Sequence, residues 1–173
     1  MDALRFLAAA STVLVTWSCV PVVPPAPSRP PAAASPGGRV GANEARIFNL
    51  INAERRRQGL VPLEYSRQLD EMAKIQARNM AYFHKMAHVL PESGTPTLAD
   101  RARHVGYSFG RLAENVAHDY PSAQSVVQGW MTSKGHRANI LNSDVVETGI
   151  AIARSSSGGL YYCQVFGRRL SSL

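Results

Sequence analysis

Two histidines and one glutamate have the side chains of a ligand-binding or catalytic site. His88, Glu114 and His136 come from three separated segments of the chain. Two imidazoles and one carboxylate form a recognised zinc set, with water in the fourth position. No HExxH helix holds two of the ligands at a fixed spacing, so a zinc site here depends on how the chain folds. The alternative is structural, with His88 and Glu114 hydrogen-bonded so that a loop is tied to the edge of a sheet.

Ser133 suggests a second kind of chemistry, because a serine near a histidine can act as the nucleophile of a hydrolase. It lies three residues before His136, close to one helical turn, and Glu114 would orient that histidine. No Gly-x-Ser-x-Gly elbow surrounds the serine, however. The simpler interpretation is that Ser133 and the two residues after it end the preceding helix. The remaining histidines have no supporting motif, and we expect them at the surface: His84, His104 and His118.

Two helices come first among the elements that must position these residues. Apolar residues recur at helical spacing after Asn43, a suitable N-cap, and Gly59 is a suitable stop. Three arginines, residues 55–57, fall in the last turn, and we interpret them as a solvated helix end rather than a binding patch. A second helix follows the N-cap Ser66 and is the most regular amphipathic segment of the chain. It leads into the segment that carries His88.

Three more helical segments are expected further along the chain. Thr97 and Asp100 resemble a capping box that starts a short helix, which Gly106 ends. Ser122 is a suitable N-cap for a longer helix. Residues 136–141 have the pattern of a short helical turn, which places His136 at its beginning.

Strand patterns are confined to the second half of the chain. A short stretch at residues 112–117 contains Glu114, and two β-rich runs at 148–154 and 160–166 flank a Ser/Gly loop. Two such runs with a short loop between them predict a hairpin. Helices therefore precede and cover a small antiparallel sheet, and the fold class is α+β.

The N-terminus has the pattern of an export signal. Arg5 precedes an apolar run at residues 6–17, which is too short for a transmembrane helix of about 20 apolar residues. Cys19 follows a small residue, as at a lipoprotein cleavage site, although Thr16 and Trp17 match that pattern poorly. Lipidation of Cys19 and plain secretion therefore both stay open. We predict a signal peptide at 1–18, a Pro/Ala-rich spacer at 19–42 and one folded domain at 43–170.

Charge and cysteine content narrow the range of partners. The 173-residue chain carries a net charge of +7, which favours anionic partners such as cell-wall polymers or acidic lipids. No nucleic-acid-binding motif is present, so we expect no nucleic acid partner. The two cysteines, Cys19 and Cys163, do not make a disulfide framework. Cys163 lies in an apolar strand pattern, where a thiol is usually a small buried hydrophobe.

Several motifs together resemble one family. Residues 113–117 resemble a Gly-Glu-Asn-hydrophobic-Ala motif, and residues 130–141 resemble a bacterial Trp-x-x-Ser-Pro-Gly-His-Arg-x-Asn-Ile-Leu block. An opening helix at 49–63 and closing strands at 149–151 and 161–167 complete the set. In this order, over roughly residues 43 to 168, the motifs resemble the bacterial CAP/SCP superfamily of cysteine-rich secretory, antigen 5 and pathogenesis-related proteins.

The resemblance implies an α-β-α sandwich with a central antiparallel sheet and a polar cleft. In eukaryotic members, two histidines and two glutamates line the cleft, sometimes with a divalent metal. His88 and Glu114 match the first histidine and the first glutamate. Ser133 and Tyr161 stand where the second glutamate and the second histidine belong, so half of the tetrad is replaced. His136 belongs to the bacterial block and is expected to point into the same cleft.

Three functions are consistent with these observations. The leading hypothesis is a monomeric, extracytoplasmic binding protein whose cleft engages a cell-wall polymer or a lipid, with membrane contact only through its N-terminal signal or a lipid anchor. The second is a hydrolase that uses zinc or another divalent cation held by His88, His136 and Glu114. The third is a structural or interaction protein with a vestigial cleft.

Overall fold

The computed structural model describes residues 41–170. The predicted signal peptide, the predicted spacer and Cys19 lie outside the described residues. Within residues 41–170, no helix is both long and apolar enough to cross a membrane.

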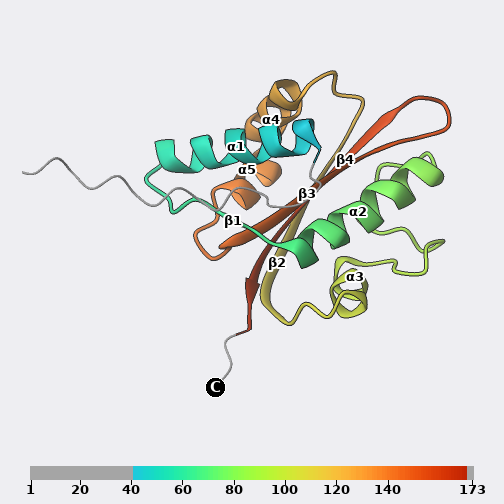
Figure 1. Ribbon diagram of the computed structural model, residues 1–173, viewed down its shortest axis with the longest axis horizontal. Helices are drawn as coiled ribbons and strands as arrows, with labels where there is room; N and C mark the ends of the chain where they lie inside the picture. The colour runs from blue at the N-terminus through green and yellow to red at the C-terminus, as the bar shows by residue number, and fades with distance from the viewer. Residues whose placement is uncertain (1–40, 171–173) are drawn as a thin grey trace, which may run out of the picture. The chain divides into compact units, whose positions relative to one another are not determined.

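A four-stranded sheet forms the middle layer of the domain (Figure 1). Its strands are β1 (Glu64–Tyr65), β2 (Phe109–His118), β3 (Glu147–Arg154) and β4 (Leu160–Arg169), in the order β1-β3-β4-β2. The predicted hairpin is β3 and β4, and β2 also pairs antiparallel with β4. The two-residue β1 pairs parallel with β3, which adds one short parallel contact to the antiparallel sheet that we expected. Because β2 lies at the end of this order, one of its edges pairs with no other strand of the described sheet.

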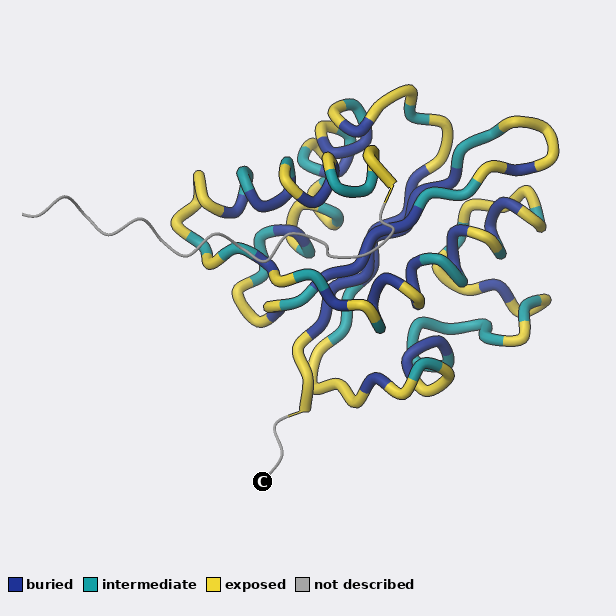
Figure 2. The backbone as a smooth tube through the Cα atoms, in the orientation of Figure 1, coloured by how far each residue is buried: buried dark blue, intermediate teal, exposed yellow. Residues whose placement is uncertain are grey.

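Helices cover both faces of the sheet, so the predicted α-β-α sandwich is confirmed. On one face lie α1 (Ala42–Arg57), α4 (Ala123–Thr132) and α5 (Lys134–Ile140). On the other face lie α2 (Arg67–Tyr82) and α3 (Leu98–His104). Figure 2 shows the resulting burial, with the strands buried in the middle of the sheet and exposed toward their ends, and the helices buried along the side that meets the sheet.

Alternation along β4 supplies both halves of the core. Tyr162 and Phe166 point to the α1/α4 layer, whereas Cys163 and Val165 point to the α2 layer. Successive side chains of a strand point to opposite faces, so a strand that is covered on both faces contributes to two apolar clusters. The same alternation in β2 places Glu114 and Asn115 on opposite faces, and this separates the two halves of the candidate site.

Local capping chemistry agrees with most of the predicted helix starts. The capping box of Thr97 and Asp100 is present at the start of α3, and Ser122 caps α4 through Ser125. Ser66 occupies the N-cap position of α2 without a side-chain capping bond. The prediction that Asn43 caps the first helix is wrong, because α1 begins at Ala42 with Gly41 as its N-cap.

Arg55 corrects the interpretation of the arginine run as a solvated helix end. It is 2% exposed and donates to four backbone carbonyls, those of Val61, Ile140, Asn142 and Val145. Arg56 and Arg57 are exposed as expected. Arg55 lies one helical turn after Ile51 on the buried face of α1, so its guanidinium reaches the loop before β3 instead of solvent.

Candidate functional site

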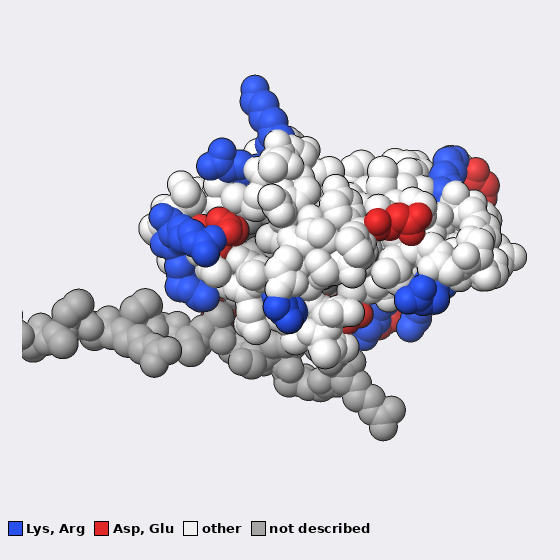
Figure 3. All heavy atoms as spheres, turned by 90° about the horizontal axis from the view of Figure 1, so that it is seen from above, with Lys and Arg blue, Asp and Glu red and all other residues white. Residues whose placement is uncertain are grey.

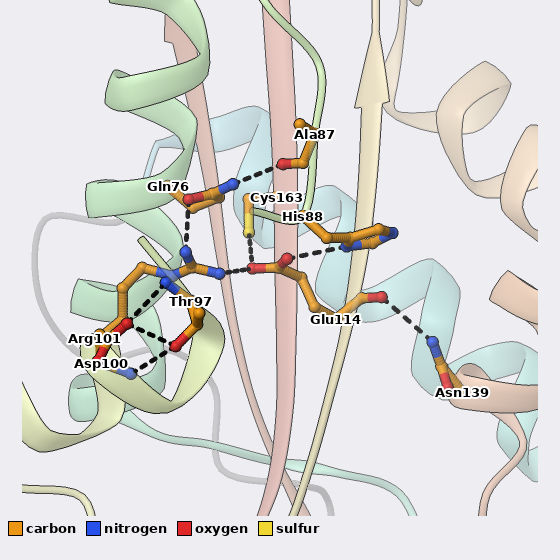
Figure 4. Close-up of polar contacts among 9 residues, drawn as sticks. All are labelled: Gln76, Ala87, His88, Thr97, Asp100, Arg101, Glu114, Asn139 and Cys163. Atoms are coloured by element: carbon orange, nitrogen blue, oxygen red, sulfur yellow. Dashed lines mark hydrogen bonds and ion pairs between the residues drawn. The ribbon is translucent and has the colours of Figure 1, made fainter. Parts of the chain in front are cut away.

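Glu114 is the centre of the polar contacts on the α2/α3 side of β2 (Figure 4). Its side chain is only 3% exposed, and both carboxylate oxygens accept hydrogen bonds. Oε1 accepts from His88 Nδ1 at 2.9 Å, and Oε2 accepts from the Arg101 guanidinium at 2.5 Å. The structure therefore brings together His88 and Glu114, as predicted, and adds an arginine that the sequence analysis did not select.

Arg101 is fully buried in α3 and neutralises the Glu114 carboxylate. Its other terminal nitrogen donates to Gln76 Oε1 at 2.6 Å, and Gln76 in turn donates to the backbone carbonyl of Ala87 at 2.6 Å. Ala87 is the residue before His88. The chain of bonds thus links α3, α2 and the loop that carries His88, so the carboxylate is held from two directions (Figure 4).

His88 is the exposed end of this network. Its side chain is 54% exposed, and because a carboxylate only accepts hydrogen bonds, the proton of the shared bond lies on Nδ1. Nε2 points away from Glu114 (Figure 4). The hydrogen bond to Glu114 raises the pKa of His88, and burial and the charge of Arg101 partly oppose that shift. In its neutral form His88 presents Nε2 as an acceptor, and in its protonated form as a donor.

His136 approaches from the opposite layer, at the start of α5. Burial and, to a smaller extent, the charge of His88 lower its pKa. The Asn139 side chain fastens α5 to β2, donating to the Glu114 carbonyl at 3.2 Å and to the Asn115 side chain at 2.9 Å. Asn115 donates back to the His136 carbonyl at 3.2 Å. We call His88, Arg101, Glu114 and His136 the edge site, because Glu114 and Asn115, which hold the segments that carry the others, lie in β2, the strand at the end of the sheet.

The other two residues of the expected cleft are placed differently. Ser133 lies between α4 and α5, where it is the C-cap of one and the N-cap of the other. Tyr161 is 3% exposed, faces the α2 layer and stacks on His118 with ring centroids 4.2 Å apart. Neither side chain takes part in the hydrogen bonds of Glu114 within residues 41–170. A cleft shared by all five residues therefore stays a prediction.

Cys163 is a buried neighbour of the edge site, without exposure to solvent. Its thiol lies 3.5 Å from Glu114 Oε2 and donates to it. Burial, reinforced by the negative charge of Glu114, raises the pKa of this thiol well above its usual range. A thiol in that state is not nucleophilic, which agrees with the expectation that Cys163 is a structural residue.

The donor groups at the edge site do not fit a divalent metal. Among residues 41–170, no group of three or more His, Cys, Asp or Glu side chains is arranged to hold one. Glu114 gives Oε2 to a guanidinium at 2.5 Å, and that fixed positive charge opposes a cation bound to the same carboxylate. His88 uses Nδ1 on Oε1, which leaves its Nε2 and the imidazole of His136 as the remaining ligands. The predicted His₂Glu zinc set gains no support from this arrangement.

Arg101 is the site residue that the sequence analysis missed, and a signal for it exists. It falls between Leu98, Ala102 and Val105 on the stripe that helical periodicity assigns to the buried face of α3. An arginine on such a stripe has to find a buried acceptor. Glu114, in the neighbouring strand pattern, is such an acceptor, but the register that joins them is a property of the tertiary fold.

The sequence of this chain is similar to a known family of proteins. A sequence model of the cysteine-rich secretory protein family, CAP, matches residues 48–166. The uncharacterized protein YkwD of Bacillus subtilis (strain 168) is 35% identical over 118 residues, which are 68% of this chain and 45% of that protein.

Solved structures agree with this match. An extracellular protein containing a SCP domain from Bacillus anthracis str. Ames has a TM-score of 0.66 at 27% identity, over 77% of this chain and 45% of its own. An outer surface protein from Borrelia burgdorferi has the same TM-score of 0.66 at 22% identity, over 72% of this chain and 90% of its own, and supports the fold alone.

The chain spans less than half the length of either Bacillus protein. The family match nevertheless includes all four strands in whole or in part, the helices on both faces and every residue of the edge site. The resemblance seen in the motifs is thereby confirmed, and the chain belongs to the cysteine-rich secretory protein (CAP) family.

Proposed function

We propose that this protein is an extracytoplasmic binding protein whose edge site holds a polar group of a cell-wall polymer. The observation that carries the proposal is the state of His88, a half-exposed imidazole held by a buried carboxylate. Glu114 is itself fixed by Arg101, so the imidazole is oriented before a ligand arrives. An oriented imidazole whose Nε2 makes no hydrogen bond within residues 41–170 suits a hydroxyl, an amide or an acidic group on a carbohydrate or peptide.

The surroundings of the histidines favour binding over hydrolysis. Within the described part of the chain, no serine hydroxyl or cysteine thiol is hydrogen-bonded to His88 or His136. A nucleophile needs a bond to a base that activates it, and Ser133 has no such bond to either histidine within residues 41–170. The Cys163 thiol donates to the Glu114 carboxylate, but burial raises its pKa and keeps it protonated. The poor fit to a metal also removes the support for a metal-activated water.

The choice of a cell-wall polymer follows from charge and from the relatives. The chain has a net charge of +7, which attracts the anionic polymers of cell envelopes. The similar solved protein from Bacillus anthracis is described as extracellular. The export signal predicted for residues 1–18 agrees with the same compartment.

Sedimentation of the full chain with insoluble isolated peptidoglycan tests this proposal. We expect the wild-type protein to co-sediment and His88→Ala to lose most of its binding, whereas His104→Ala, an exposed histidine on α3, keeps it. A charge-matched unrelated protein controls for non-specific attraction. Equal binding by wild type and His88→Ala would overturn the proposal, as would binding to anionic lipid vesicles with none to peptidoglycan.

A further inference from the structure

A second candidate site lies between the end of α2 and the β3–β4 hairpin, two elements that can be followed in Figure 1. The two elements enclose a pocket of about 380 Å³, near the lower end of the 300–1,000 Å³ range typical of small-ligand sites. Its lining includes Arg78, Tyr82, Arg154 and Ser156 and shares no residue with the edge site.

Uncompensated positive charge is the first property of this pocket. Arg78 and Arg154 both line it, and no aspartate or glutamate does. Within residues 41–170, the side chain of Arg78 makes no hydrogen bond or ion pair, and the only side-chain bond of Arg154 is to the neutral carbonyl of Gly158, at 2.7 Å. Two guanidinium groups without carboxylate partners suit an anionic group, because each can bind a phosphate or carboxylate through two parallel bonds.

Hydrogen bonds hold the β3–β4 turn that forms one wall of the pocket. Ser155 is 7% exposed, and its backbone bonds to Gly158 and Gly159 close the turn. Gly158 has a φ of +94°, a conformation that favours glycine. The bond from Arg154 to the Gly158 carbonyl then holds that guanidinium against the turn. His84, from the loop after α2, contacts the hydroxyls of Ser156 and Ser157 and joins the two walls.

An exposed aromatic ring is the second property of the pocket. Tyr82 is 78% exposed, and Phe83 holds its ring edge-on with centroids 5.0 Å apart. Aromatic faces bind the apolar face of a flat ring or a sugar, and the phenol of Tyr82 and the hydroxyl of Ser156 offer hydrogen bonds to the hydroxyls of that sugar.

The face of the domain that carries α1 and α4 differs from this pocket in its charge. There, charged side chains stand in small groups around a wide uncharged area (Figure 3).

We propose that this pocket binds an anionic sugar, with Arg78 and Arg154 on its acidic group and Tyr82 against its ring. The pocket would be a second ligand-binding site of the protein, beside the edge site. The proposal stands on this pocket alone and does not require the edge site to bind anything.

Isothermal titration calorimetry of the full chain with N-acetylglucosamine 1-phosphate tests the proposal. We expect the sugar phosphate to bind at least about tenfold more tightly than neutral N-acetylglucosamine, because charge-assisted hydrogen bonds contribute most. Inorganic phosphate should bind more weakly than the sugar phosphate, since it does not contact Tyr82. Equal affinity for neutral sugar and sugar phosphate, or for phosphate alone, would overturn the assignment.

Variants separate a built site from general attraction. Arg78→Gln with Arg154→Gln should lower the affinity at least about tenfold, and Tyr82→Ser should weaken the sugar phosphate but not inorganic phosphate. The matched control is Arg46→Gln with Arg56→Gln, which removes the same charge from two exposed positions of α1. An equal loss in the control would refute a specific pocket.

A last comparison separates this proposal from the proposed function. His88→Ala should leave binding of the sugar phosphate unchanged, whether or not the edge site binds peptidoglycan. The Arg78/Arg154 double variant should lose sugar phosphate binding to the same extent when His88 is also replaced. Loss of sugar phosphate binding in His88→Ala alone would place the anionic ligand at the edge site and overturn the second pocket.

Discussion

Replacing Arg101 with methionine removes one member of the buried ion pair and keeps a long side chain in its place. Arg101 is fully buried and Glu114 is 3% exposed at its side chain, so water cannot replace the lost partner. Breaking a buried pair by removing one member costs about 3–5 kcal/mol. The Arg101 Nε is buried without a partner within residues 41–170, which makes the native pair less favourable. We therefore expect Arg101→Met to lower the free energy of unfolding by about 3 kcal/mol, the lower end of that range.

Equilibrium unfolding in urea measures this loss, and a double-mutant cycle assigns it to the pair. Glu114→Gln removes the charge that Arg101 neutralises, so the double variant should lose less stability than the sum of the two single changes. We expect a coupling energy of about 2 kcal/mol, within the range for residues in one hydrogen-bond network.

The same variant has a second readout at His88. The charge of Arg101 lowers the pKa of His88, so its removal should raise that pKa above the wild-type value, which an NMR titration of the imidazole can follow. A cost below about 1 kcal/mol for Arg101→Met, with additive single changes and an unchanged His88 titration, would refute the central role of this ion pair.

Three further outcomes are expected. The pKa of His88 is raised in the folded state, so its contribution to stability is complete below the unfolded pKa of about 6.5 and is lost as pH rises through the folded pKa; the difference in unfolding free energy between wild type and His88→Gln should be larger at pH 5 than at pH 8. A Cβ at Gly149 would overlap the backbone of α2, so Gly149→Ala should cost about 3 kcal/mol in urea unfolding, whereas Gly135→Ala, with open space around it, should be neutral or stabilising. Arg55→Met should lower the free energy of unfolding by about 3 kcal/mol, seen in calorimetry as a lower melting temperature, because it leaves buried carbonyls without donors. Arg56→Met should change the melting temperature little, and equal effects of the two variants would contradict the buried role of Arg55.

Arginine shows where interpretation of the sequence was incomplete. Arg55 and Arg101 both lie on helix faces that carry apolar residues, and both are buried. Periodicity alone would have placed both inside. The charge of Arg55 and its position in an Arg-rich turn favoured a solvated interpretation, and Arg101 was not selected at all. A buried guanidinium is tolerated only where acceptors surround it. Those acceptors come from residues as distant as Val145 for Arg55, so no local pattern displays them.

The residues of the candidate site also differ in how far the sequence could identify them. His88 and Glu114 could be selected by type and by resemblance, and their contact at 2.9 Å is confirmed. The bonds of Asn115 and Asn139 that fasten α5, the helix of His136, to β2 join separated segments and are a property of the tertiary fold. That the His136 side chain points into the same cleft stays a prediction. Tyr161 was placed in the cleft by its position in a motif, and the register of β4 against β2 sets it beside His118.

The sequence by itself determined what depends on neighbouring residues. The capping boxes of α3 and α4, the β3–β4 hairpin and the amphipathic face of α2 arise from contacts a few residues apart, so their patterns are visible in the chain. Only the tertiary structure decided the chemistry of Glu114. Arg101 stands thirteen residues before it and Gln76 twenty-five before Arg101, and their bonds form only when α2, α3 and β2 pack together. The sequence suggests the Glu114 carboxylate as a metal ligand, but the fold pairs it with the buried Arg101 guanidinium. A buried charge is costly unless an opposite charge and hydrogen bonds compensate it.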